Sequence, residues 1–236
     1  MKRLNRKVVF ITNVLLIGIF ITVYAFMFIP ETIVPISTDN GMEAIYNGDR
    51  NKKRVSMMFN VYEGTEIVNG ILDLLKEYDA KATFFVGGCW ADDNGETLIR
   101  IVNEGHEIAN HGYFHKDHKS LDYKMNEQEI LLTGKIIESL CGEKPKLFAP
   151  PSGSFSFTTL EAANNLGYKV IMWSKDTIDW RDKDENIIIK RATSGVTNGD
   201  LILMHPKKHT LAALDDIILQ YKALGLEMVT VSENIS

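Results

Sequence analysis

The sequence from His106 to His118 reads HEIANHGYFHKDH and holds four of the six histidines of the 236-residue chain. Two of them, His111 and His115, are four residues apart. That spacing predicts both imidazoles on one side of a single helical turn, within reach of one metal ion. A histidine-rich surface loop is the alternative interpretation. A predicted strand directly before the cluster favours the metal site, because functional side chains gather at strand ends in alternating α/β folds.

On both sides of this stretch, apolar runs of strand length alternate with amphipathic segments of helical period. The predicted strands cover residues 55–60, 82–86, 106–109, 146–149, 169–174, 201–204 and 227–231. The predicted helices cover residues 65–78, 96–104, 126–140, 158–166, 185–193 and 211–224, with Asn126 as the expected N-cap of the third. Strands joined by helices run parallel through right-handed crossovers. The pattern therefore predicts an α/β fold, either a closed β/α barrel or an open doubly wound sheet.

Polar or tight-turn residues follow five of the seven predicted strands. They are Asn60 to Glu63, His111 and His115, Pro150 to Gly153, Asp176 to Trp180, and His205. In either architecture the carboxyl ends of parallel strands meet at one edge, so we expect these residues to form one functional rim. After the first strand the sequence reads NVYEG, which is not a glycine-rich phosphate loop, and the histidines do not complete HExxH. These patterns disfavour a nucleotide site and a zinc protease.

The composition suits one globular domain with a sizeable core plus an N-terminal appendage, since 45% of the residues are hydrophobic. The 26 basic and 31 acidic residues give a net charge of −5, which provides no basic field for a phosphate backbone. We therefore expect no nucleic-acid partner. Cys89 and Cys141 are too few for a disulfide framework and form no CxxC pair. They either pair with each other or remain two half-buried thiols.

Residues 1–29 are predicted to be an N-terminal membrane anchor. Basic residues precede an apolar run from Val8 to Ile29 that is long enough to span a bilayer. Positive charge on that flank keeps the N-terminus in the cytoplasm and places the rest outside. A cleaved signal peptide is the alternative, but the run exceeds a typical signal-peptide core and no clear cleavage site follows. Residues 30–42 are then a tether, and residues 43–236 form an extracytoplasmic domain on a single-pass cell-membrane protein.

Five sequence blocks, in this order, resemble the polysaccharide deacetylases with the NodB homology domain, also called carbohydrate esterase family 4. The blocks are KATFFVGG from Lys81, GHEIANHGYFH from Gly105, LFAPPSGSF from Leu147, WSKDTIDW from Trp173 and DLILMHP from Asp200. The resemblance implies a distorted seven-stranded β/α barrel. Within the family, the Val-Tyr and Ala-Pro-Pro-Ser-Gly variants are most similar to a membrane-anchored, sporulation-associated branch.

The resemblance also implies a mechanism and its residues. A divalent metal, expected to be Zn²⁺, would be held by one Asp and by His111 and His115, and it would polarise the acetamide carbonyl and its attacking water. His205 matches the general acid, and Asp176 resembles the carboxylate that orients it. The residues implied in the substrate groove are Pro150, Trp180 and Tyr62.

This chain departs from the family pattern in the first conserved block. Where the family has Thr-Phe-Asp-Asp-Gly, this chain has MFNVY, so Asn60 stands at the general base and Val61 at the carboxylate ligand. An amide is not a proton acceptor at neutral pH, and an isopropyl group offers no lone pair. The Arg that braces the base is also replaced, by Ala149. Glu63 is the nearby acid that could take the place of the lost ligand, although a solvent-exposed loop carboxylate is the simpler interpretation.

Two hypotheses follow. The first is a metal-dependent deacetylase that removes N-acetyl groups from peptidoglycan or chito-oligosaccharide, impaired by the changes at Asn60 and Val61. The second is a non-catalytic domain that keeps the groove and binds glycan or a partner in the cell envelope. Cell-wall glycan and the membrane are the expected partners in both cases, and the sequence leaves the oligomeric state open.

Overall fold

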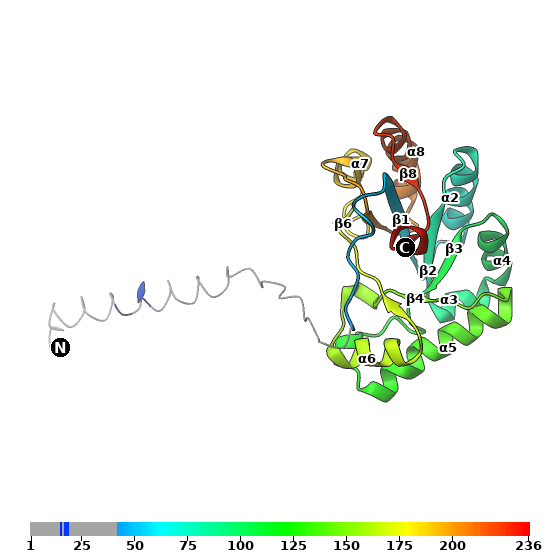
Figure 1. Ribbon diagram of the computed structural model, residues 1–236, viewed down its shortest axis with the longest axis vertical. Coiled ribbons are helices and arrows are strands. Elements are labelled where there is room, and N and C mark those ends of the chain that lie inside the picture. Colours follow the sequence, from blue (N-terminus) through cyan, green and yellow to red (C-terminus); the bar gives the residue numbers. More distant parts are fainter. Residues whose placement is uncertain (1–14, 16, 19–41) are drawn as a thin grey trace, which may run out of the picture. The chain divides into compact units, whose positions relative to one another are not determined.

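The computed structural model describes residues 42–236 and, near the N-terminus, Leu15, Ile17 and Gly18 (Figure 1). The chain divides into two compact units, Met1–Ser37 and Thr38–Ser236, and only the second is described at length. The predicted anchor, residues 1–29, and the tether, residues 30–42, lie almost entirely outside the described residues. Among the residues that are described, no helix combines the length and hydropathy that crossing a bilayer requires.

An eight-stranded parallel sheet forms the centre of the domain. Its strands are β1 (Arg54–Val61), β2 (Ala82–Val86), β3 (Glu107–Asn110), β4 (Leu147–Phe148), β5 (Lys169–Val170), β6 (Lys175–Asp176), β7 (Asp200–Met204) and β8 (Glu227–Met228). Seven of them follow the order β5-β4-β3-β2-β1-β7-β6, and β8 pairs with the start of β1. The expected α/β fold with parallel strands is confirmed. The expected seven-stranded barrel is observed as a curled half-barrel of seven strands, with β8 added beside β1.

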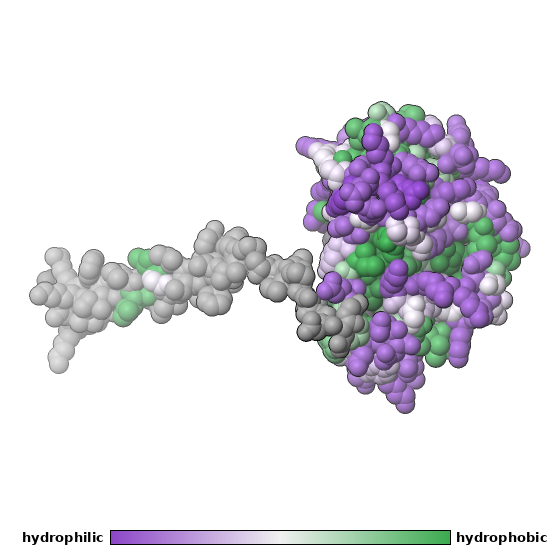
Figure 2. Space-filling model, in the orientation of Figure 1, coloured by the Kyte–Doolittle hydropathy of each residue, from purple (hydrophilic) through white to green (hydrophobic). Residues whose placement is uncertain are grey.

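Helices cover the outer face of this curled sheet (Figure 1). They are α2 (Thr65–Glu77), α3 (Gly88–Asp93), α4 (Gly95–Asn103), α5 (Tyr123–Cys141), α6 (Phe157–Asn165), α7 (Glu185–Thr193), α8 (Lys208–Ala223) and α9 (Val231–Asn234), with short 3-10 turns at His118–Ser120 and Pro151–Gly153. On the face shown in Figure 2, hydrophilic side chains predominate around smaller apolar areas. This surface is that of a domain whose apolar residues are mainly internal.

Strand β1 is buried on both of its faces, and its residues alternate between two apolar clusters. Phe59 and Val61 belong to the large cluster between the sheet and the helices, where Phe59 stacks on Phe84 with ring centroids 5.2 Å apart. Met58 belongs to the smaller cluster inside the curl, together with Phe85. This alternation decides the direction of each side chain at the end of β1.

The segment before β1 contacts the end of β5 and the start of β7. Ile45 donates its N–H to Val170 at 2.8 Å and accepts the N–H of Met172 at 2.7 Å. Gly48 then donates its N–H to Gly199, just before β7, at 2.7 Å. This segment therefore joins the β5 side of the sheet to the β7 side.

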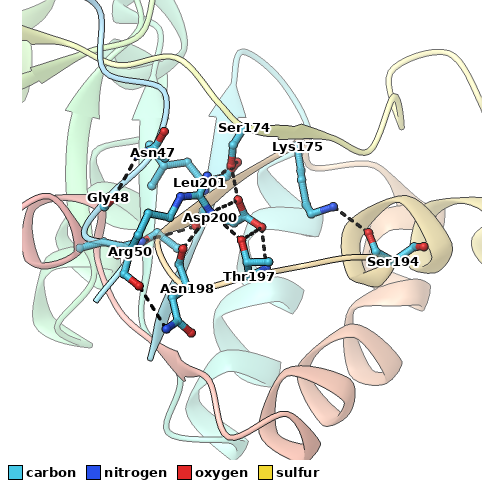
Figure 3. A network of polar contacts seen from close by, with 12 residues as sticks. Asn47, Gly48, Arg50, Ser174, Lys175, Ser194, Thr197, Asn198, Asp200 and Leu201 are labelled. Carbon is cyan, nitrogen blue, oxygen red and sulfur yellow. Dashed lines mark hydrogen bonds and ion pairs between the residues drawn. The ribbon is translucent and has the colours of Figure 1, made fainter. Parts of the chain in front are cut away.

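A polar network at the start of β7 fixes the same junction (Figure 3). Asp200 is 4% exposed, and its Oδ1 accepts hydrogen bonds from Arg50 Nη1 at 2.8 Å and Ser174 Oγ at 2.9 Å. Its Oδ2 accepts the N–H of Thr197 at 2.8 Å. Burial raises the pKa of Asp200, but these donors outweigh it, so the pKa lies below its ordinary value. One carboxylate thus connects three segments at the amino end of the sheet, away from the predicted rim.

Several predicted elements differ from the observed ones. Of the predicted strand 169–174 only Lys169–Val170 is observed, as β5, and β6 begins after the predicted range, at Lys175. The last strand ends at Met228, before α9 begins at Val231. Asn126 is not an N-cap, because α5 begins at Tyr123 and Asp122 accepts the N–H of Met125 at 2.8 Å. Asn126 is instead fully buried and hydrogen bonded to His118. Cys89 and Cys141 are half-buried free thiols.

Candidate functional site

A pocket of about 540 Å³ opens at the carboxyl ends of the central strands. Its lining comes mainly from the segments that follow β1, β3, β4, β6 and β7. The lining residues are Asn60, Tyr62, Glu63, His115, Ser152, Trp173, Asp176, Trp180, Leu203, His205, Pro206 and Lys207. The structure therefore brings together residues that are distant in sequence. Pro150, which was expected in the groove, is buried and is not among these lining residues, whereas the exposed Ser152 two positions on is.

His111 and His115 lie on a loop after β3 and not on a helical turn. Gly112 and His115 both have positive φ, at 72° and 54°, which reverses the chain between the two imidazoles. Their ring centroids are 5.6 Å apart. A side chain at Gly112 would also collide with His118, whose Nε2 lies 2.9 Å from the position of a Cβ. The four-residue spacing thus brings the rings together through loop geometry.

His111 is held as a neutral imidazole with one free nitrogen. It is 2% exposed, and its Nδ1 donates to the carbonyl of Ala149 at 2.7 Å. Burial lowers the pKa of His111 to about 3. The Nδ1–H bond leaves the lone pair on Nε2, which can bind a ligand. The partly exposed His115 also has a lowered pKa, chiefly through burial.

Glu129 on α5 supports the histidine loop from behind. It is 4% exposed, and its Oε2 accepts the N–H groups of Tyr113 at 2.9 Å and Phe114 at 2.7 Å. Lys116 neutralises the other oxygen at 3.1 Å. Glu129 is not among the residues predicted from the sequence to form the site. A buried carboxylate far along the chain from its donors has no local sequence signal.

His205 is oriented by Asp179, so the expected role of Asp176 is wrong. His205 Nδ1 lies 2.7 Å from Asp179 Oδ1, and the other oxygen accepts the N–H of His205 and the hydroxyl of Thr210, both at 2.7 Å. Asp176 instead accepts the N–H of Ile178 at 2.7 Å. Ile178 has a φ of 54°, and this left-handed residue turns the chain so that the next side chain faces His205. Asp176 still lines the pocket.

The carboxylate of Asp179 is ionised despite its burial. It is 1% exposed, and burial by itself raises its pKa. The hydrogen bonds from His205 and Thr210 outweigh that cost, so the pKa of Asp179 lies below its ordinary value. A buried carboxylate with these donors fixes the tautomer of His205 and leaves Nε2 as the nitrogen that can act on a ligand.

None of the three positions linked to the general base or the carboxylate ligand provides a free carboxylate in the pocket. Asn60 lines the pocket, is 5% exposed, and has a buried Oδ1 without a hydrogen-bond partner among the residues that the structure describes. Val61 is fully buried in the outer cluster with Val86 and Trp90 and does not line the pocket. Glu63 forms an ion pair with Lys207 at the mouth of the pocket, and this hydrogen bond lowers its pKa.

These residues do not fit a complete metal centre. Within residues 42–236 and the three described near the N-terminus, no group of three or more His, Cys, Asp or Glu side chains is placed to hold a metal ion. A catalytic zinc site needs three protein ligands. The loop supplies only His111 and His115, Val61 is apolar, and Glu63 is engaged by Lys207. The tentative assignment of Glu63 as a ligand is therefore not supported.

Comparison with known proteins decides the family. Residues 47–171, more than half of the chain, match the family model for polysaccharide deacetylase. This chain belongs to the polysaccharide deacetylase family. It is 34% identical over 190 residues to a peptidoglycan-N-acetylglucosamine deacetylase of Bacillus cereus, covering 78% of this chain and 69% of that protein.

Other members of the family are equally informative. The chain is 38% identical to the uncharacterized protein YlxY of Bacillus subtilis over 191 residues, 81% of this chain and 60% of YlxY. The solved structure of BA3943 from Bacillus anthracis, described as a CE4 family pseudoenzyme, has a TM-score of 0.81 at 35% identity and covers 84% of this chain and 70% of that one. A BA3943 mutant is described as having restored enzymatic activity. Polysaccharide deacetylase relatives thus include both working enzymes and a pseudoenzyme.

Replacement of Asp179 should cost far more stability than replacement of Asp176. In Asp179→Asn, one side of the amide cannot accept, so a buried donor loses its partner, and we expect a loss of about 2–4 kcal/mol in the free energy of unfolding. Asp176→Asn is the matched control, because its amide oxygen can still accept the N–H of Ile178. Urea unfolding at pH 7 measures both. Equal losses would contradict the assignment of Asp179.

The stability difference between wild type and Asp179→Asn should also depend on pH. Because the pKa of Asp179 is depressed in the fold, its stabilisation is complete above the ordinary carboxyl pKa of about 4 and is lost as the pH falls through the native value. The difference between wild type and Asp179→Asn should therefore shrink below about pH 4.

A carboxylate at position 61 should make the stability of the domain depend on metal. Val61 is fully buried among apolar side chains, so Val61→Asp should unfold at a lower temperature than the wild type without metal. Zn²⁺ at about 100 times its Kd should return about 2.7 kcal/mol, or a Tm increase of about 5–10 °C. Val61→Asn is the control, since an amide is a poor zinc ligand. An equal Zn²⁺ response in the wild type would show that the native site is already complete.

Proposed function

We propose that this domain binds N-acetylated cell-wall glycan in the pocket at the strand ends and that its hydrolysis of the acetamide bond is impaired. Asn60 carries the proposal. Its buried Oδ1 faces no donor among the described residues, although the side chain lines the pocket. Leaving such an oxygen unpaired costs about 1–3 kcal/mol, so a ligand that donates a hydrogen bond there is favoured. The N–H of an acetamido group is a donor of this kind.

The remaining lining suits a sugar. Trp180 is 57% exposed and borders the pocket together with Trp173, so two indole surfaces are available for the apolar face of a pyranose ring. His205, oriented by Asp179, places a polarised imidazole in the same pocket. It can donate a proton to a leaving amine. This arrangement supports the proposed role of His205 as a general acid.

The base side is what impairs the reaction. The amide of Asn60 can accept a hydrogen bond from a ligand, but it cannot remove a proton from water at neutral pH. Loss of a general base typically slows a reaction by about 10²–10⁴-fold. The similarity to peptidoglycan deacetylases supports the substrate class. We therefore propose that this domain is an N-deacetylase that turns over slowly.

A second candidate function is a non-catalytic glycan- or partner-binding domain of the cell envelope. Two observations favour it: Asn60 and Val61 are replaced together, and the chain is similar to the BA3943 pseudoenzyme. Binding and hydrolysis make separate demands on the pocket, because binding needs shape and hydrogen-bond partners whereas hydrolysis needs an activated water.

Acetate release separates the two functions. We expect full-length protein with N-acetylated peptidoglycan or chito-oligosaccharide and Zn²⁺ to release acetate slowly, and Asn60→Asp/Val61→Asp to release it roughly 10²-fold faster or more. Adding His205→Ala to the double variant is the control and should remove the gain. If the double variant gains nothing while glycan still binds, the domain is a binding module. If neither form binds glycan, the proposal is wrong.

We also propose that residues 1–29 anchor the protein in the cell membrane with the domain outside, as in a membrane-anchored, sporulation-associated branch of the family. The basic flank and the long apolar run support this location. Full-length protein should remain in the membrane fraction after a high-salt wash. Recovery of a shortened soluble form that begins beyond residue 25 would instead indicate a cleaved signal peptide.

A further inference from the structure

We infer that Tyr62 is a positioning residue that holds the loop from His111 to His115 in place without a metal ion. A metal would join the two imidazoles through their side chains. In this domain a side chain at the end of β1 joins the backbone of the same loop, from one histidine to the other. This inference concerns the loop itself and does not depend on whether the pocket binds glycan.

The hydroxyl of Tyr62 contacts both ends of the loop. Its oxygen lies 2.7 Å from the carbonyl oxygens of His111 and of Gly112, and its hydrogen is shared between these two acceptors. The same oxygen accepts the N–H of His115 at 2.9 Å. One hydroxyl therefore uses its donor and an acceptor lone pair to close the loop on itself. The loop is also tied to β1 through this residue.

The ring of Tyr62 occupies a place that is built for it. A Cβ at Gly87 would lie 2.1 Å from Cε1 of the ring, so the close approach requires glycine at that position. On its other side the ring meets His115 edge-on, with centroids 4.7 Å apart, and His111 at 5.3 Å. The ring is thus packed between the end of β2 and the two histidines. A side chain held in this way can hold the loop in turn.

The direction of the neighbouring residue supports the same conclusion. Val61 turns into the apolar layer with Val86, so the end of β1 presents a phenol to the histidine loop and no carboxylate. The hydrogen bonds of Tyr62 involve the loop backbone and leave Nε2 of His111 free. The two imidazoles are therefore kept close together by the protein, and the loop does not need a metal to take this shape.

The test is amide hydrogen exchange, measured by NMR on full-length protein in detergent. In the wild type the N–H of His115 should be protected, and the protection should be the same with EDTA and with Zn²⁺. In Tyr62→Phe the exchange of this N–H should be roughly tenfold faster or more, because its acceptor is gone and His115 is exposed. The amides of Phe59 and Phe84 in the sheet should keep their wild-type rates.

Tyr113→Phe is the matched control. Tyr113 lies on the same loop, and its hydroxyl has no hydrogen-bond partner within the described part of the chain, so this variant should exchange like the wild type. Unchanged exchange at His115 in Tyr62→Phe would overturn the inference. So would wild-type protection that disappears in EDTA, because the loop would then depend on metal. Equal acceleration at Phe59 and Phe84 would also overturn it, by showing a general loss of stability.

Discussion

The parallel pairing of β1 with β2 and β7 is the constraint on which the site depends. In this register Asn60 is level with Phe85 and Val61 with Val86. Successive side chains of a strand point to opposite faces. The ladder therefore brings Asn60 to the pocket and sends Val61 into the apolar layer under the helices. A carboxylate at position 61 would have to leave this apolar packing to reach the pocket.

The two sides of the site are built by different means. The acid side is a buried, multiply hydrogen-bonded pair, since Asp179 accepts from His205 twice and from Thr210. The base side has an unpaired amide oxygen at Asn60 and a tyrosine that binds the loop backbone. Among the described residues, this pocket therefore combines an oriented imidazole at His205 with an unpaired amide oxygen, and no carboxylate, at Asn60.

The contacts that stabilise the fold and the pocket lie at opposite ends of the strands. The Asp200 network ties Arg50 and Ser174 to the start of β7 at the amino end of the sheet. The pocket lies at the opposite, carboxyl end. This arrangement allows the loops around the pocket to change without disturbing the contacts that close the fold. The residues Asn60 and Val61 at the pocket end are accordingly compatible with an architecture similar to that of BA3943.

Much of the fold could be predicted from the sequence, because hydrophobic periodicity indicates which faces of helices and strands are buried. The site could be located because functional residues gather at the carboxyl ends of parallel strands. The alternation of strands and helices and the common rim follow from residue types alone, whereas the missing carboxylates at Asn60 and Val61 follow from the resemblance to the family. The direction of a side chain beyond a strand end follows from neither, since it depends on loop dihedrals. Left-handed residues at His115 and Ile178 decided that the histidines meet on a loop and that Asp179, not Asp176, faces His205. Only the tertiary structure could place Tyr62 on that loop, because its partners lie about fifty residues away and are brought to it by the pairing of β1, β2 and β3.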